Sequence, residues 1–333
     1  MQDDLVRSSG RRETIAPAFF GCDRAVSTTL ILVQILNGLQ LGILLFLIAA
    51  GLTLVFGVMG FINLAHGVQY MVGAYFAVAF YGLTGNFLAA MVLALASALV
   101  LGLLLEFLVF RHLYDRDHLD QVLATFGIIL FLNQATTVIW GPAPLIIPQP
   151  EFLAGSIPLT GGLLYPVYRL AIIGAGLAVA ALLWFIVTRT RLGMLVRAGA
   201  TNPDMVSALG VDVRRLFMLV FGFGAMLAGF AGVLSAPIFS VEPGMGDNLL
   251  IVAFVVIIVG GIGSIRGSFI AALLIGLVDT LGRSLATDIL KLFIDASSAN
   301  QIGPAIASML IYVLMAAILF FRPTGLFSVG RAT

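Results

Sequence analysis

Runs of about 20 apolar residues recur along the whole chain and constrain its fold more than any other feature. A helix needs about 20 apolar residues to cross a bilayer, whereas membrane β-barrel strands give short alternating segments. Only 10% of the 333 residues are charged, against roughly 25% in a soluble domain. We therefore predict an all-α fold, a polytopic transmembrane helical bundle with eight to ten membrane segments, some of them broken or re-entrant.

Arginines divide the loops between the apolar runs into two classes. The loops and tails with arginine are 1–27, 111–120, 189–215, the turn around 266 and the stretch after 321, whereas 141–163, 236–248 and 287–301 hold almost no positive charge. The positive-inside rule places the first class in the cytoplasm. Both termini are then expected in the cytoplasm of a multi-pass membrane protein.

One membrane domain over 28–322 is expected, between a basic cytoplasmic N-terminal tail (1–27) and a cytoplasmic C-terminal tail (323–333). The number of crossings in 28–85 is the open point. Gln34, Asn37 and Gln40 interrupt the first apolar run. A half-span at about 28–39 followed by a span at about 41–59 fits this pattern.

Scarce residue types exclude several kinds of chemistry. Lys291 is the only lysine and does not follow a glycine, so the chain has no Gly-Lys-Ser/Thr loop for nucleotide phosphates. The single Cys22 and the three histidines give no metal-ligand cluster. Dispersed arginines give no reason to expect nucleic acid. We predict no catalytic residues, no metal and no cofactor in this chain, so that any ATP with Mg²⁺ is bound and hydrolysed by another subunit.

The polar segment 189–215 lies between two apolar runs and contains a well-marked short helix. Asn202 suits its N-cap, Pro203 its first position, and Gly210 its end. The apolar Met205, Val206 and Leu209 have a spacing that places them on one face. We predict that this helix docks into a groove on a soluble cytoplasmic partner. A helix lying in the lipid headgroup layer is the alternative.

Two glycine-dense stretches each follow a short apolar run, and we predict a broken helix along a transport path at each. Glycine at this density permits a helix to break or backbones to pack closely. The candidate residues are Gly57, Gly60, Asn63, His66 and Gly67 in the first stretch and Gly260, Gly261, Gly263 and Ser264 in the second. Close helix packing is the alternative for any single glycine, and a backbone hydrogen bond is the alternative for His66. Asp279 and Arg283, four residues apart, are expected to neutralise each other.

Nearly the whole chain, from about 30 to 328, resembles the LivH-type permeases of branched-chain amino acid ABC importers. The motifs that carry the resemblance are the stretch 51–67 ending in Asn63-Leu-Ala-His-Gly67, the residues Arg197, Asn202 and 208–210, the glycine-rich stretches 224–232 and 260–267, and the tail 322–326. One departure is Val68, where the family often has Glu.

The resemblance implies the permease of an ATP-driven importer that moves a branched-chain or hydrophobic amino acid, or a related carboxylate or amide. It implies four kinds of partner: a second, LivM-like permease, two cytoplasmic ATPases, a periplasmic solute-binding protein and the lipid bilayer. The segment 193–210, with Arg197, would couple the permease to the ATPase. An ion-coupled secondary transporter is the alternative function, although it usually needs several buried acids.

Overall fold

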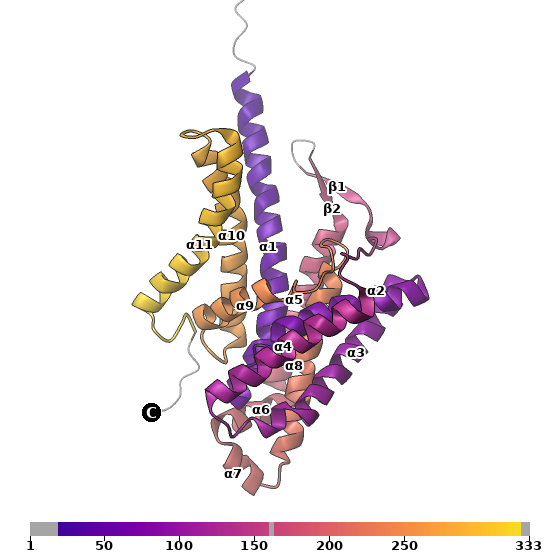
Figure 1. Cartoon of the computed structure of the whole chain (residues 1–333). Coiled ribbons are helices and arrows are strands. Elements are labelled where there is room, and N and C mark those ends of the chain that lie inside the picture. Colours follow the sequence, from indigo (N-terminus) through magenta and orange to yellow (C-terminus); the bar gives the residue numbers. More distant parts are fainter. Residues whose placement is uncertain (1–18, 160–162, 328–333) are drawn as a thin grey trace, which may run out of the picture.

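The computed structural model describes residues 19–159 and 163–327, and this part of the chain is a helical bundle (Figure 1). In chain order the α-helices are α1 (Phe19–Met59), α2 (His66–Thr84), α3 (Phe87–Leu108), α4 (His118–Trp140), α5 (Val167–Arg189), α6 (Arg191–Thr201), α7 (Pro203–Ala208), α8 (Val213–Ser235), α9 (Asp247–Gly260), α10 (Ile265–Leu290) and α11 (Ala296–Phe321). Seven segments of the described residues are long and apolar enough to cross a membrane. The predicted helical membrane fold is confirmed.

Short elements occupy some of the loops. The 3-10 helix η1 (Phe110–His112) follows α3. A second 3-10 helix, η2 (Glu151–Leu153), comes just before a β-hairpin. The hairpin pairs β1 (Ser156–Pro158) antiparallel with β2 (Leu164–Pro166). The sequence did not predict this hairpin, which lies in the loop that we identified by its lack of arginine.

Helix α1 is continuous over 41 residues, so the expected half-span at 28–39 is wrong. A polar residue within the helix is satisfied by its neighbours: Asn37 Oδ1 accepts hydrogen bonds from Arg169 Nη1 at 2.7 Å and Tyr165 Oη at 3.3 Å. A buried polar group with such partners requires no helix break. Helix α1 begins at Phe19, inside the stretch 1–27 that we expected to be a tail, and residues 1–18 lie outside the described part.

Helix α1 is also the centre of the bundle, packed against α10, α8, α5 and α9. Two glycines one turn apart, Gly38 and Gly42, face α10. A Cβ atom at Gly42 would lie 2.8 Å from the Cα of Leu273, and one at Gly38 would lie 3.0 Å from the Cα of Leu277. Such pairs of small residues let membrane helices approach closely where no hydrophobic effect drives them together. The glycines therefore fix α1 and α10 in one register.

The described part of the chain ends against the short helix α9. The 14 residues of α9 span about 21 Å, which is less than a bilayer core of about 30 Å. Leu326 N donates to Val259 O at 2.8 Å and Phe327 N to Gly260 O at 3.0 Å. The carbonyls at the end of α9 are thus satisfied by the segment that we expected to begin a free tail at 323.

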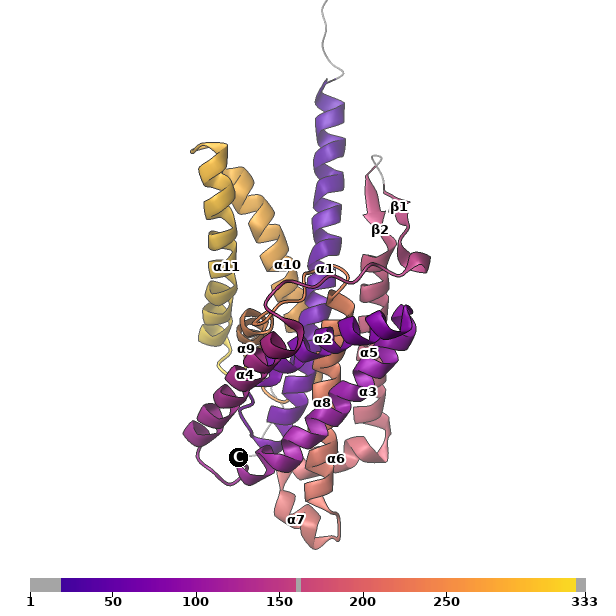
Figure 2. The ribbon, with the colours of Figure 1, turned by 45° about the vertical axis from the view of Figure 1, so that its right-hand side comes forward.

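The arginine-bearing loops after α1 gather on the side of the molecule that carries α6 and α7, away from the β1–β2 hairpin (Figures 1 and 2). The stretch 1–27 is the exception, because α1 starts within it at the other end. Helix α1 ends on this side, because the ring of Phe61 packs 5.3 Å from Phe110 and 5.7 Å from Tyr114, measured between centroids. An unbroken helix of 41 residues is about 60 Å long. Its start therefore lies at the opposite end.

The described chain terminates on the α1 C-terminal side instead. Gly325 packs against Gly261, and Gly263 packs against Gly57, close to the end of α1. The expectation that both termini lie on one side is therefore wrong for the described residues.

Candidate functional site

Local hydrogen bonds build the helix pair α6 and α7 from its own sequence. Thr190 Oγ1 accepts from Gly193 N at 3.2 Å and so caps α6, and Asn202 Oδ1 accepts from Met205 N at 2.9 Å and so caps α7. Pro203 occupies the first position of α7, and Gly210 ends it with φ of +84°. These are the caps expected from sequence.

Helices α6 and α7 lie at one end of the molecule (Figure 2), and several apolar side chains on them are exposed. Met205 and Leu209 are 60% and 77% exposed, and Leu192 and Met194 on α6 are more than half exposed. Val206, in contrast, is only 6% exposed. The prediction that Val206 shares the docking face is wrong, because its side chain packs inward and anchors α7. Leu192 and Met194 are further exposed apolar side chains on α6, which the sequence analysis did not single out.

Arg197 holds α6 against the end of α5. Its Nη1 donates a hydrogen bond to Val187 O, one of the carbonyls in the last turn of α5. Those carbonyls have no partner within their own helix. Gly193 approaches the same turn so closely that a Cβ would collide with the carbonyls of Ile186 and Val187. Arg197 therefore holds α6 beside the end of α5, although its side chain is exposed.

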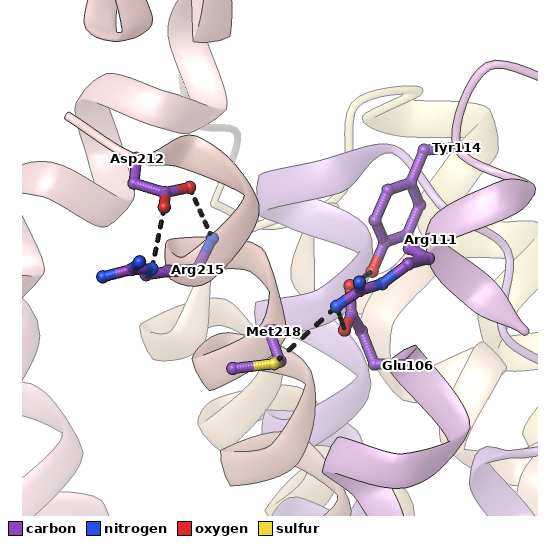
Figure 3. A network of polar contacts seen from close by, with 6 residues as sticks. All are labelled: Glu106, Arg111, Tyr114, Asp212, Arg215 and Met218. Carbon is purple, nitrogen blue, oxygen red and sulfur yellow. Dashed lines mark hydrogen bonds and ion pairs between the residues drawn. The ribbon is translucent and has the colours of Figure 1, made fainter. Parts of the chain in front are cut away.

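Two groups of polar contacts lie along this part of α8, and the second connects α8 to α3 (Figure 3). Asp212 Oδ1 caps α8 through Arg215 N at 3.1 Å, and its Oδ2 lies 2.9 Å from Arg215 Nε. One turn further on, Met218 Sδ lies 3.9 Å from Arg111 Nη2. Movement of α7 at the base of α8 would thus reach Arg111 through one helix.

Arg111 in turn belongs to a buried ion pair. Its Nη2 lies 3.2 Å from Glu106 Oε2, and its guanidinium carbon lies 4.1 Å from the centre of the Phe107 ring. Tyr114 Oη donates to Glu106 Oε1 at 3.2 Å. Burial, and next the negative charge of Glu106, raise the pKa of the Tyr114 hydroxyl well above its ordinary value. Tyr114 therefore stays a hydrogen-bond donor to Glu106.

The two glycine-rich stretches form breaks between helices, and the structure brings them together. Gly60 (φ +65°) follows α1, and Gly261 (φ +101°) and Gly263 (φ +80°) join α9 to α10. A Cβ on Gly57 would lie 2.7 Å from the Cα of Gly263, so the two breaks touch through backbone. Ser264 caps α10 by accepting from Gly267 N at 3.1 Å. Gly260, the last residue of α9, packs against Gly267.

Buried polar groups surround the start of α2 beside this junction. His66 Nε2 donates to Ile48 O at 3.1 Å, because a carbonyl can only accept. His66 therefore makes a backbone hydrogen bond, which is the alternative that we gave for it. Asn63 is fully buried, and neither of its amide atoms has a partner within the described residues; the same holds for the amide of Gln69.

Gly67 packs against the start of α9, since a Cβ there would lie 2.6 Å from Gly246 O. The sequence reading did not include Gln69. Its position one turn after His66 in an apolar run was the available signal.

Comparisons with known proteins agree with this architecture. Residues 34–319 match the family model for the permease component of the branched-chain amino acid transport system. The high-affinity branched-chain amino acid transport system permease protein BraD of Pseudomonas aeruginosa is 31% identical over 306 residues, which cover 88% of this chain and 94% of the relative. LivH of Escherichia coli is 31% identical over 261 residues, which cover 74% and 84%. No solved structure matches.

The resemblance carried by the motifs at 51–67 and 260–267 is thereby confirmed, since both lie inside the matched range. The match also covers α6, α7 and the whole docking face. A permease of this kind is the non-catalytic membrane component of its transport system. The chain belongs to the family of permease components of branched-chain amino acid ABC transport systems.

Proposed function

We propose that this chain forms half of the transmembrane pathway of an ATP-driven importer in the bacterial inner membrane. It pairs with a second, LivM-like permease and with two cytoplasmic ATPases that bind ATP and Mg²⁺. A periplasmic binding protein delivers a branched-chain or other hydrophobic amino acid, or a related carboxylate or amide. The observation that carries this proposal is the exposed apolar face of α6 and α7, where Met205 and Leu209 project from the arginine-bearing end.

The orientation follows from charge. The end with α6 and α7 carries the loops with arginine, so the positive-inside rule places it in the cytoplasm. The hairpin β1–β2, the start of α1 and the α10–α11 connection then face the periplasm. The described C-terminal end is cytoplasmic, whereas α1 starts on the periplasmic side.

The mechanism is alternating access driven from the cytoplasmic face. Closure of the ATPases on the α6–α7 face moves the base of α8, which contacts Arg111 on the α3 side through Met218. The helices shift about the touching breaks at 57–67 and 260–267, where Gly57 and Gly263 meet through backbone. The binding protein selects the cargo, so the permease itself needs few polar groups in its spans.

The test is the double substitution Met205→Asp with Leu209→Asp. Two carboxylates on this face would have to be buried in the ATPase groove without partners, which is costly. We expect the variant to enter the membrane at normal levels, to lose copurification of the ATPase chains and to lose ATP-dependent uptake. Leu164→Asp, an equally exposed leucine on β2 at the opposite end, is the matched control and should keep its ATPases. Normal ATPase binding in the double variant would remove the docking role.

A further inference from the structure

A polar pocket opens between α1 and the outer half of α10. It has a volume of about 380 Å³ and is lined by Gln34 of α1 and by polar residues of α10 between Thr280 and Lys291. Below it, Gly38 and Gly42 hold the two helices in backbone contact. The helices separate beyond that contact, toward the end with the α10–α11 connection (Figure 2). The pocket therefore begins where the glycine seam ends.

The lining of the pocket is a single stripe along α10. Thr280, Arg283 and Ser284, Asp288 and Lys291 follow one another at steps of three or four residues, which places them on one helix face. Each of these side chains is polar or charged, although α10 is long and apolar enough to span the membrane. Charged groups at this depth face water or protein rather than lipid. The stripe thus lines an open hollow that faces water at the end of α10.

With Asp279, which pairs with Arg283 from just outside the lining, the charges of the pocket are balanced, but they are incompletely paired. Arg283 binds Asp279 through Nε at 2.9 Å and Nη2 at 2.7 Å, and among the described residues its Nη1 has no hydrogen-bond partner. Lys291 Nζ has one contact, to Asp288 Oδ1 at 3.4 Å, and the Asp288 side chain is 68% exposed. Donors for an anion and an acceptor for a cation therefore stand in one pocket.

We propose that this pocket is the outer vestibule of the permease and receives the cargo as an amino acid zwitterion. The cargo carboxylate accepts hydrogen bonds from Arg283 Nη1 and from Lys291, and its ammonium group pairs with the Asp288 carboxylate. The Gln34 side-chain amide can hydrogen-bond to either group of the cargo. The volume lies in the range of small-molecule sites, about 300–1,000 Å³. Balanced charge favours a neutral zwitterion over a free anion or cation. This inference rests on the proposed function. It adds the residues of the permease that the cargo contacts first after the binding protein releases it.

The test uses the complete importer in proteoliposomes, with its binding protein, ATP and radiolabelled L-leucine. Asp288→Asn and Lys291→Gln each remove one charge from an exposed position. We expect each to lower uptake roughly two- to fivefold, as for a partly solvated charge pair, and to lower the leucine moved per ATP hydrolysed. Glu151→Gln, an exposed acid on η2, is the matched control and should leave this ratio unchanged.

Arg283→Gln is made together with Asp279→Asn, because removing Arg283 alone would leave a buried carboxylate unpaired. This pair should lower leucine moved per ATP as strongly as either single change. Unchanged uptake in all three variants, or uptake and ATP hydrolysis falling in proportion, would overturn the vestibule. Absence of ATP-dependent leucine uptake in the wild-type importer would instead count against the proposed function, so the two failures are distinct.

Discussion

At the scale of single residues, Glu106 is the acid on which the polar contacts between α3 and α8 depend. Its side chain is 2% exposed and meets both Arg111 and Tyr114 at 3.2 Å. An ionised carboxylate at this depth is tolerated only with such partners. The same pair faces Met218 on α8, so it stabilises the contact between the two helices as well as its own charge.

Arg111→Met should destabilise the protein by leaving Glu106 buried without its cation. Breaking a buried pair costs about 3–5 kcal/mol, and the 34% exposure of Arg111 reduces this to about 2 kcal/mol. Thermal unfolding in detergent measures the loss. Arg116→Met, an exposed arginine in the same loop, should change stability little. Adding Glu106→Gln to Arg111→Met should recover part of the loss, and no recovery would contradict the role of the buried charge.

The residue scale also shows where sequence reasoning succeeds. Asn202, Pro203 and Gly210 were predicted correctly because a cap, a first-turn proline and a positive φ are local requirements of a helix. The burial of Val206 and the hydrogen bond of Arg197 to Val187 were not foreseen, because both depend on contacts with other elements. A burial direction and a contact with Val187 depend on how α6 packs on α5, which the spacing of apolar residues does not encode.

At the scale of elements, backbone meets backbone where the end of α1 contacts the α9–α10 turn at Gly57 and Gly263. Gly57→Ala would place a methyl 2.7 Å from the Cα of Gly263, and such overpacking costs about 1–3 kcal/mol. We expect a lower melting temperature and slower ATP-dependent uptake. Gly82→Ala is the control, since a Cβ there meets nothing within 4 Å and alanine is the better helix former. Equal behaviour of the two variants would contradict a tight junction.

The main error of the sequence analysis, the half-span expected at 28–39, concerns where a helix begins and ends. The breaks at 57–67 and 260–267 were predictable because several glycines coincide with the end of an apolar run. The continuity of α1 through Gln34, Asn37 and Gln40 was not, because Asn37 finds Arg169 and Tyr165 more than a hundred residues away. Local sequence marks a polar residue but does not reveal whether a distant donor will satisfy it.

At the scale of the whole molecule, the two ends of the bundle should differ in access to reagents. Ser207 on α7 and Ser297 on α11 are both exposed. In a variant lacking Cys22, a membrane-impermeant maleimide should label Ser297→Cys in intact spheroplasts and Ser207→Cys only after lysis. Labelling in the reverse order would invert the proposed orientation. Equal labelling of both cysteines before lysis would indicate leaky membranes. Labelling of a cytoplasmic protein in the same sample is the control for such leakage.

The docking of the C-terminal segment on α9 has a practical consequence for anyone handling this permease. Leu326 and Phe327 complete the hydrogen bonding of Val259 and Gly260, directly before the glycine turn that touches α1. The apolar pattern alone suggests that the chain could be truncated at Arg322 without harm. Such a truncation would remove the hydrogen-bond donors to the last carbonyls of α9, in the middle of the bundle. Reporter fusions and purification handles belong beyond Phe327, and shortened versions should be judged by transport rather than by yield.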